Sequence, residues 1–114
     1  MVRSGVDGST LLVTGRLSIR PDRRDGALSA ALALAEASRL EPGCIEFRVF
    51  CDASDPYLLV FFEQWSGVDA MTRNFQTFHM TQFREAAKLF AVGELEVKRF
   101  VVMPVAPVQS QMAS

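Results

Sequence analysis

The distribution of hydrophobic and polar residues along the chain points first to residues 57–62, where six apolar and aromatic residues follow one another. A run of this length is too short to span a membrane and is typical of a strand that is buried on both faces. Glu63 and Trp65 follow this run closely, and a helical pattern that begins a few residues later contains Asn74 and His79. We therefore expect any chemical site of this protein near the end of that strand.

Hydrophobic residues with a spacing of two predict strands, and those with a spacing of three and four predict helices, over most of the remaining chain. Strands are predicted at residues 10–20, 44–52, 57–62 and 94–103. Helices are predicted at residues 27–40, 66–76 and 78–91. In the first helix, Leu28, Ala31, Leu32 and Ala35 form the stripe that is expected to face the sheet. Turn residues between the second and third strands predict an antiparallel hairpin.

This order of elements is the split βαβ pattern of a ferredoxin-like α+β sandwich, in which helices cover one face of a four-stranded antiparallel sheet. We predict one domain at residues 10–104, preceded by a flexible arm at residues 1–9 and followed by a loose tail at residues 105–114. The other face of the sheet has no helix to cover it, although the strand at 57–62 is apolar on both faces. Because an identical chain is the simplest cover, we expect a homodimer packed sheet to sheet.

Composition narrows the classes of partner. The chain has 114 residues, enough for one domain, and its net charge of −1 comes with scattered basic residues. We therefore expect neither nucleic acid nor a membrane surface as a partner. Nine phenylalanines are more than a small α+β core needs. The surplus could line an apolar ligand cavity or a subunit interface.

The cysteines and the single histidine argue against a disulfide and against a metal centre. Cys44 and Cys51 are seven residues apart, and an odd separation on one strand places two side chains on opposite faces. With one histidine and no CxxC motif, we expect no metal site. The first ten residues are polar and contain glycine, without the apolar segment of a signal peptide, so we expect a reduced, cytoplasmic setting.

Four short motifs lie at the ends of the predicted elements. They are Glu41-Pro42-Gly43-Cys44, Asp55-Pro56, Glu63-x-Trp65 and His79-Met80-x-x-Phe83. Together, over about residues 11–103, they resemble the antibiotic biosynthesis monooxygenase family of dimeric α+β barrels. The resemblance implies that two sandwiches pair into a barrel and that each chain has a pocket between its sheet and its helices.

The resemblance also implies a function. Some members of the family oxygenate polycyclic phenols with dioxygen and need no flavin, metal or haem. We therefore expect a monooxygenase without cofactors that acts on a phenolic, polycyclic aromatic or quinol-like small molecule. In such members an asparagine, a tryptophan and aromatic or basic residues hold the substrate. The catalytic candidates are His79, Trp65 and Asn74, and the candidate substrate-binding residues are Phe62, Phe75, Phe78, Phe83 and Arg16. Haem-degrading members have asparagine where this chain has Gly15, which argues against haem degradation.

Each catalytic candidate also has a purely structural interpretation. A phenol must lose a proton before it can pass an electron to dioxygen, and His79 is the one side chain that titrates near neutral pH when unperturbed. His79 could instead cap the last helix. Trp65 could stack on a flat substrate or seal the core, and Asn74 could donate to an oxyanion or face solvent. The phenylalanines are core residues by default.

Two other functions fit the same sequence. One is isomerisation or degradation of a small oxygenated metabolite by His79 acid–base chemistry, without oxygen. The other is a dimeric ligand-binding module without catalysis, which a pocket filled by phenylalanine side chains would favour. We expect Glu63 to pair with an arginine, Arg16 or Arg48, rather than to act as a catalytic acid.

Overall fold

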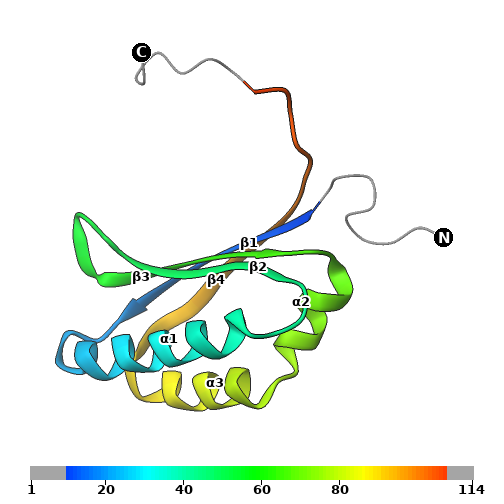
Figure 1. The fold of residues 1–114 in the computed structure, drawn as a ribbon. Helices are drawn as coiled ribbons and strands as arrows, with labels where there is room; N and C mark the ends of the chain where they lie inside the picture. The colour runs from blue at the N-terminus through cyan, green and yellow to red at the C-terminus, as the bar shows by residue number, and fades with distance from the viewer. Residues whose placement is uncertain (1–9, 108–114) are drawn as a thin grey trace.

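The computed structural model describes residues 10–107 and confirms the ferredoxin-like α+β fold (Figure 1). The strands are β1 (Thr10–Ile19), β2 (Cys44–Asp52), β3 (Asp55–Trp65) and β4 (Ala91–Val102). The helices are the 3-10 turn η1 (Pro21–Arg23), α1 (Arg24–Arg39), α2 (Val68–Phe75) and α3 (Phe78–Phe90). The arm predicted at residues 1–9 lies outside the described residues, as does the predicted tail from residue 108 onward. Residues 103–107 form no helix or strand and run away from the sheet.

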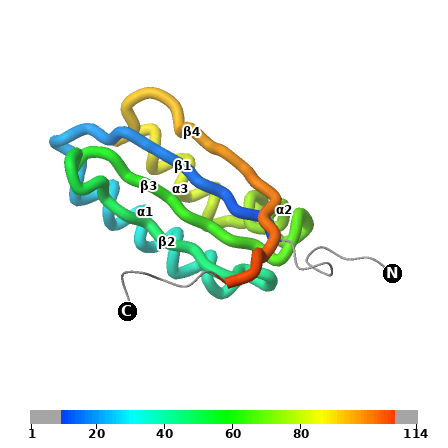
Figure 2. Tube along the Cα trace, turned by 90° about the horizontal axis from the view of Figure 1, so that it is seen from above, coloured from blue at the N-terminus to red at the C-terminus, as the bar shows by residue number. Residues whose placement is uncertain are grey.

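The four strands form one antiparallel sheet in the order β2-β3-β1-β4. Helices α1 and α3 lie side by side under one face, and α2 closes one end between them and the sheet (Figures 1 and 2). β4 begins at Ala91, directly after α3 and three residues earlier than predicted. Gly93, with φ of 75°, is part of this strand. The other face of the sheet is covered by no element within residues 10–107.

Alternation along β3 sorts its side chains between the two faces. Leu59, Phe61 and Trp65 face the helices and are buried. Val60 and Phe62 face the other way and are half-buried. The strand was predicted to be covered on both faces. Within a single chain the helices cover one face of β3, and the other face stays partly open.

Helix α1 packs closely on the sheet because its inner stripe consists mainly of small residues. Ala27, Ala31 and Ala35 have no exposed surface, and Leu34 is buried with them. The predicted stripe is correct for the alanines but wrong for Leu32, which is 55% exposed. Leu34 takes its place, since the helix turns 100° per residue and the buried stripe follows the alanines.

The turn between α1 and β2 depends on Gly43. Its φ is +83°, a conformation that side chains other than glycine rarely adopt. A Cβ added there would lie 2.5 Å from Ala70 Cβ and 2.6 Å from Ser66 Oγ. The Gly43 carbonyl also accepts a 2.8 Å hydrogen bond from the Ser66 backbone N–H. This contact fixes the start of α2 against the exit of α1, so the turn positions one wall of the site described below.

Gly43→Ala is expected to destabilise the fold by about 3 kcal/mol, because backbone strain and steric overlap add. Two controls separate these causes. Gly93→Ala adds a Cβ at φ of +75° with no atom within 4 Å, and should cost about 1 kcal/mol. Gly26→Ala lies in α1 with open space around it, and should stabilise by about 0.5–1 kcal/mol. Urea unfolding measures all three. Equal losses for Gly43→Ala and Gly93→Ala would contradict the role of the Ala70 and Ser66 contacts.

Candidate functional site

A cavity of about 690 Å³ lies between the sheet and helices α2 and α3. Most of its lining is apolar and comes from β1, β3, β4 and the inner faces of the helices: Val13, Gly15, Leu17, Leu34, Phe61, Met71, Phe75, Met80, Phe83, Ala87, Ala91, Leu95 and Val97. Its polar lining residues are Glu63, Asn74, Arg84, Lys88 and Arg99. A mostly apolar cavity with few polar groups is the usual form of a small-molecule site.

Gly15 lies in the part of the sheet that lines the cavity. It pairs with Phe61 on β3 and Val97 on β4, so all three residues lie in one row across the sheet. A Cβ at Gly15 would stand 3.4 Å from Leu95 Cδ1 and 3.5 Å from Phe61 Cβ, which is ordinary contact. The space beside Gly15 is therefore bounded by side chains that line the cavity.

Glu63 is the one carboxylate among the cavity-lining residues. Its Oε1 accepts a 3.0 Å hydrogen bond from Trp65 Nε1. Burial raises the pKa of the Glu63 carboxyl, and the Trp65 hydrogen bond and the Arg99 charge offset part of that effect. The expected pairing with Arg16 or Arg48 is wrong. Arg48 instead pairs with Glu46 at 3.3 Å on the other face of the sheet, where strand alternation also places Arg16.

Trp65 contacts the site only through Glu63. The indole has no exposed surface and packs edge-on against Phe47, with ring centroids 6.4 Å apart. It does not line the cavity, so it cannot stack on a ligand in this conformation. What it supplies is the N–H that holds the Glu63 carboxylate in a fixed orientation.

Asn74 and His79 lie together where α2 is followed by α3. Asn74 is 3% exposed and lines the cavity, although it sits on a short helix where a solvent-facing position was the alternative. His79 Nε2 is 3.4 Å from Asn74 Oδ1 and 3.8 Å from Glu41 Oε2. His79 does not cap α3, because Thr77 does so by accepting from the Met80 N–H at 3.3 Å. His79 therefore contacts Asn74, which lines the cavity, but does not itself line it.

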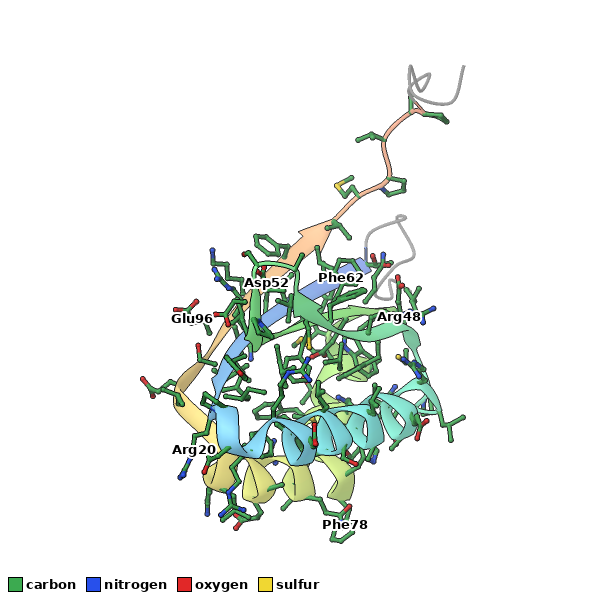
Figure 3. All side chains as sticks on the ribbon, turned by 90° about the vertical axis from the view of Figure 1, so that its left-hand side faces the viewer. Arg20, Arg48, Asp52, Phe62, Phe78 and Glu96 are labelled. Atoms are coloured by element: carbon green, nitrogen blue, oxygen red, sulfur yellow. The ribbon has the colours of Figure 1, made fainter. Side chains whose placement is uncertain are left out.

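The predicted substrate-binding residues divide into two groups. Phe75 and Phe83 line the cavity. Phe62 and Arg16 lie on the opposite face of the sheet, and Phe78 is 75% exposed on the far side of the helices. Figure 3 shows Phe62 and Phe78 on opposite sides of the molecule. The structure thus brings two of these five residues to the cavity.

Residues 10–86 match the family described as antibiotic biosynthesis monooxygenase. The chain belongs to this family. It is 26% identical over 89 residues to "Putative monooxygenase YcnE" of Bacillus subtilis, which covers 78% of this chain and 94% of that protein. It is 27% identical over 92 residues to the uncharacterised protein sll1783 of Synechocystis, covering 81% of this chain but only 63% of the length of that relative.

Solved structures agree with the family assignment. A crystal structure of an antibiotic biosynthesis monooxygenase has a TM-score of 0.77 and 28% identity, covering 82% of this chain and 99% of that one. A Deinococcus radiodurans protein has a TM-score of 0.80 at 22% identity, covering 88% of this chain and 99% of that one, which shows the fold alone. In this family fold, the cavity lies on the helix-covered face of the sheet.

Sequence reasoning missed the basic residues of this family member's cavity. Arg99 on β4 and Arg84 and Lys88 on α3 all line it. The sequence does show that Arg99 lies on the same face of its strand as Val97 and Val101, because residues two apart in a strand point the same way. It does not show which residue of that face lies in the row of Glu63, because this depends on the register between β4 and β1.

Across residues 10–107 no group of three His, Cys, Asp or Glu side chains is placed to hold a metal ion. Cys44 and Cys51 are both free, and burial raises the pKa of the Cys44 thiol. No helix in that range is long and apolar enough to cross a membrane.

The raised pKa of Glu63 predicts how stability depends on pH. The folded state binds this proton more tightly than the unfolded state, so the contribution of Glu63 to stability is present below the ordinary glutamate value, 4.5, and is lost as pH rises through the folded pKa. Glu63→Gln keeps an oxygen acceptor for Trp65 but does not titrate. The stability of the wild type relative to Glu63→Gln should therefore fall as pH rises from 4.5 towards neutrality and then level off.

Urea unfolding at a series of pH values measures this difference. Glu46→Gln, which removes a carboxylate from the other face of the sheet, is the control and should not reproduce the effect. A wild type that gains stability relative to Glu63→Gln over the same pH range would contradict the assignment.

Proposed function

We propose that this chain is a monooxygenase that uses dioxygen, without a cofactor, to oxidise a phenolic, polycyclic aromatic or quinol-like small molecule. The observation that carries the proposal is the cavity itself. In a member of the antibiotic biosynthesis monooxygenase family, it combines apolar walls with one half-buried carboxyl of raised pKa and one buried amide. These supply a proton acceptor, a donor for an oxyanion and an apolar environment, which the chemistry requires.

Glu63 is the base in this proposal. A carboxylate of raised pKa takes the phenol proton more readily than an exposed one, and the Trp65 hydrogen bond leaves its second oxygen for that proton. Within residues 10–107, the Asn74 Nδ2 group makes no hydrogen bond, so it can donate to the phenolate oxygen. His79 acts by holding Asn74 Oδ1, which turns Nδ2 towards the cavity.

The phenolate supplies the electrons. It passes one electron to dioxygen, and the resulting radical pair combines at a carbon of the ring system. Attack of oxygen at a ring carbon that carries one hydrogen gives a hydroperoxide once protonated Glu63 returns the phenol proton. Cleavage of the O–O bond leaves one oxygen atom as the new carbonyl, and the other departs as water with the hydrogen of that carbon and the returned proton. Phenol and dioxygen thus balance against quinone and water. No external reductant is needed because the substrate gives up the electron pairs of its O–H and C–H bonds.

Oxygen uptake by the metal-stripped protein, followed with an electrode, tests the proposal. The panel consists of anthrone, dihydroxynaphthalenes and other polycyclic phenols. Glu63→Gln and Asn74→Ala should each lower kcat/KM by about 100-fold, the scale of a lost base or oxyanion donor. Glu46→Gln and Gln76→Ala remove a carboxylate and an amide that lie outside the cavity and should leave the rate unchanged.

The outcomes of this assay separate the candidate functions. Turnover of a small metabolite without oxygen uptake would replace the proposal with acid–base chemistry. Binding of the panel compounds without any turnover would identify a ligand-binding module.

We also propose that the chain forms a homodimer through the face of the sheet opposite the helices. That face carries half-buried Val60 and Phe62, with Phe50 52% and Phe100 45% exposed on its outer strands. A partly open apolar sheet face of this kind favours a sheet-to-sheet partner.

Phe62→Asp should disrupt the dimer, because it would bury an unpaired charge in the interface. The dissociation constant, measured by sedimentation velocity, should rise by about 100-fold or more. Phe78→Asp places the same change on the helix side, at a side chain that is 75% exposed, and should have no effect. An unaltered association state for Phe62→Asp would place the interface elsewhere.

A further inference from the structure

The charged groups that line the cavity are unbalanced. Arg84, Lys88 and Arg99 are basic, and Glu63 is the one acidic residue among the lining side chains. The chain as a whole has a net charge of −1, so this local excess of positive charge does not follow from composition. Basic residues gathered round an apolar cavity raise the local concentration of anionic ligands.

Two of the three basic groups already have partners within the chain. Arg84 lies 4.9 Å from the centre of the Phe75 ring, and its guanidinium donates to Phe75 O and to Thr81 Oγ1, each at 3.3 Å. Lys88 forms a 3.0 Å ion pair with Glu85. Both add positive potential near the cavity, but each already donates to a partner within the chain.

Arg99 differs from these two. Within residues 10–107 it forms neither a hydrogen bond nor an ion pair with another residue, although it lines the cavity. The positive charge of Arg99 lowers the pKa of Glu63, but burial raises that pKa by more. The Glu63 carboxylate is bonded to Trp65 and not to Arg99. The guanidinium fork of Arg99 is therefore left for a ligand.

The register of the sheet fixes where Arg99 lies relative to Glu63. Val13 pairs with Glu63 on one side and with Arg99 on the other, so all three residues face the helices in one row. Neighbouring strands are about 4.8 Å apart, which places the Glu63 and Arg99 backbones about 10 Å from each other. A ligand of two or three fused rings can extend from one group to the other over Val13.

We propose that the cavity binds an aromatic hydroxy acid, with its carboxylate on Arg99 and its hydroxyl group towards Glu63. An arginine fork matches a carboxylate in geometry and charge, and two parallel hydrogen bonds fix the direction in which the ring system lies. The choice of substrate rests on the proposed function, but binding of such an acid can be measured whether or not oxygen is consumed.

Isothermal titration calorimetry with two matched probes tests this proposal. The probes are 6-hydroxy-2-naphthoic acid, whose hydroxyl and carboxylate lie at opposite ends of two rings, and its methyl ester, which has the same rings and no charge. The acid should bind the wild type about tenfold or more tightly than the ester. Because Arg99 is exposed to solvent, that preference should shrink as salt is raised.

Arg99→Met and Lys98→Met provide the matched pair of variants. Each removes one positive charge from β4, but strand alternation places Lys98 on the opposite face of the sheet. Arg99→Met should weaken binding of the acid about tenfold or more and change binding of the ester by less than about twofold. Lys98→Met should leave both affinities within about twofold of the wild type. Arg99→Lys keeps the positive charge but not the guanidinium fork, so its affinity for the acid should lie between those of the wild type and of Arg99→Met.

The outcomes distinguish this proposal from the monooxygenase proposal. Equal affinity for acid and ester, no binding of the acid, or equal effects of Arg99→Met and Lys98→Met would each overturn it. Tight binding of the acid through Arg99 without oxygen uptake would support it and would count against the monooxygenase reaction alone.

Discussion

The hydrogen bond between Trp65 and Glu63 is the contact on which the site depends. Along β3, Leu59, Phe61, Glu63 and Trp65 point in turn towards the helices, so a carboxylate stands where the strand would otherwise present a hydrophobic side chain. A buried carboxylate without a partner would cost several kcal/mol. The indole N–H offsets part of this cost and orients the carboxylate. The remaining cost is expressed as a raised pKa, which makes the group suited to accept a proton.

The cavity exists because small residues face it where the core is otherwise aromatic. Phe61, Phe83 and Phe90 pack against one another, with ring centroids 5.6 and 5.9 Å apart along the series. Beside them, Gly15 contributes no side chain, and Ala87 contributes only a methyl group. Since close packing is the rule in protein interiors, a space of this size beside a well-packed aromatic cluster is more consistent with a ligand site than with a packing defect.

The sequence predicted the order of the elements and the fold class, because each element has a clear hydrophobic period and the turns carry glycine and proline. It also pointed to the end of β3, where Glu63 lines the cavity. What it could not provide was the register between strands, which brings Arg99 into the same row as Glu63. The faces were partly predictable, because Phe62 lies between Phe61 and Glu63 and must point away from them. The contact between His79 and Asn74 depends on how α2 meets α3, and spacing alone does not determine that.

Because inner and outer residues alternate, a shift of one residue in the pairing of β4 with β1 would exchange Arg99 for Lys98 beside Val13. This row lies where β1 pairs regularly with both β3 and β4, although the pairing of β2 with β3 is irregular close by. Between Arg16 and Ser18, β4 has extra residues, and Gly93 with its positive φ lies among them. Another irregularity, between Cys44 and Glu46, turns Ile45 outward to 53% exposure at the far edge of the sheet. From Val13 to Arg16 the pairing with both neighbours is continuous. The regular centre of the sheet therefore holds the site residues in register, while its ends absorb the bends that the connections require.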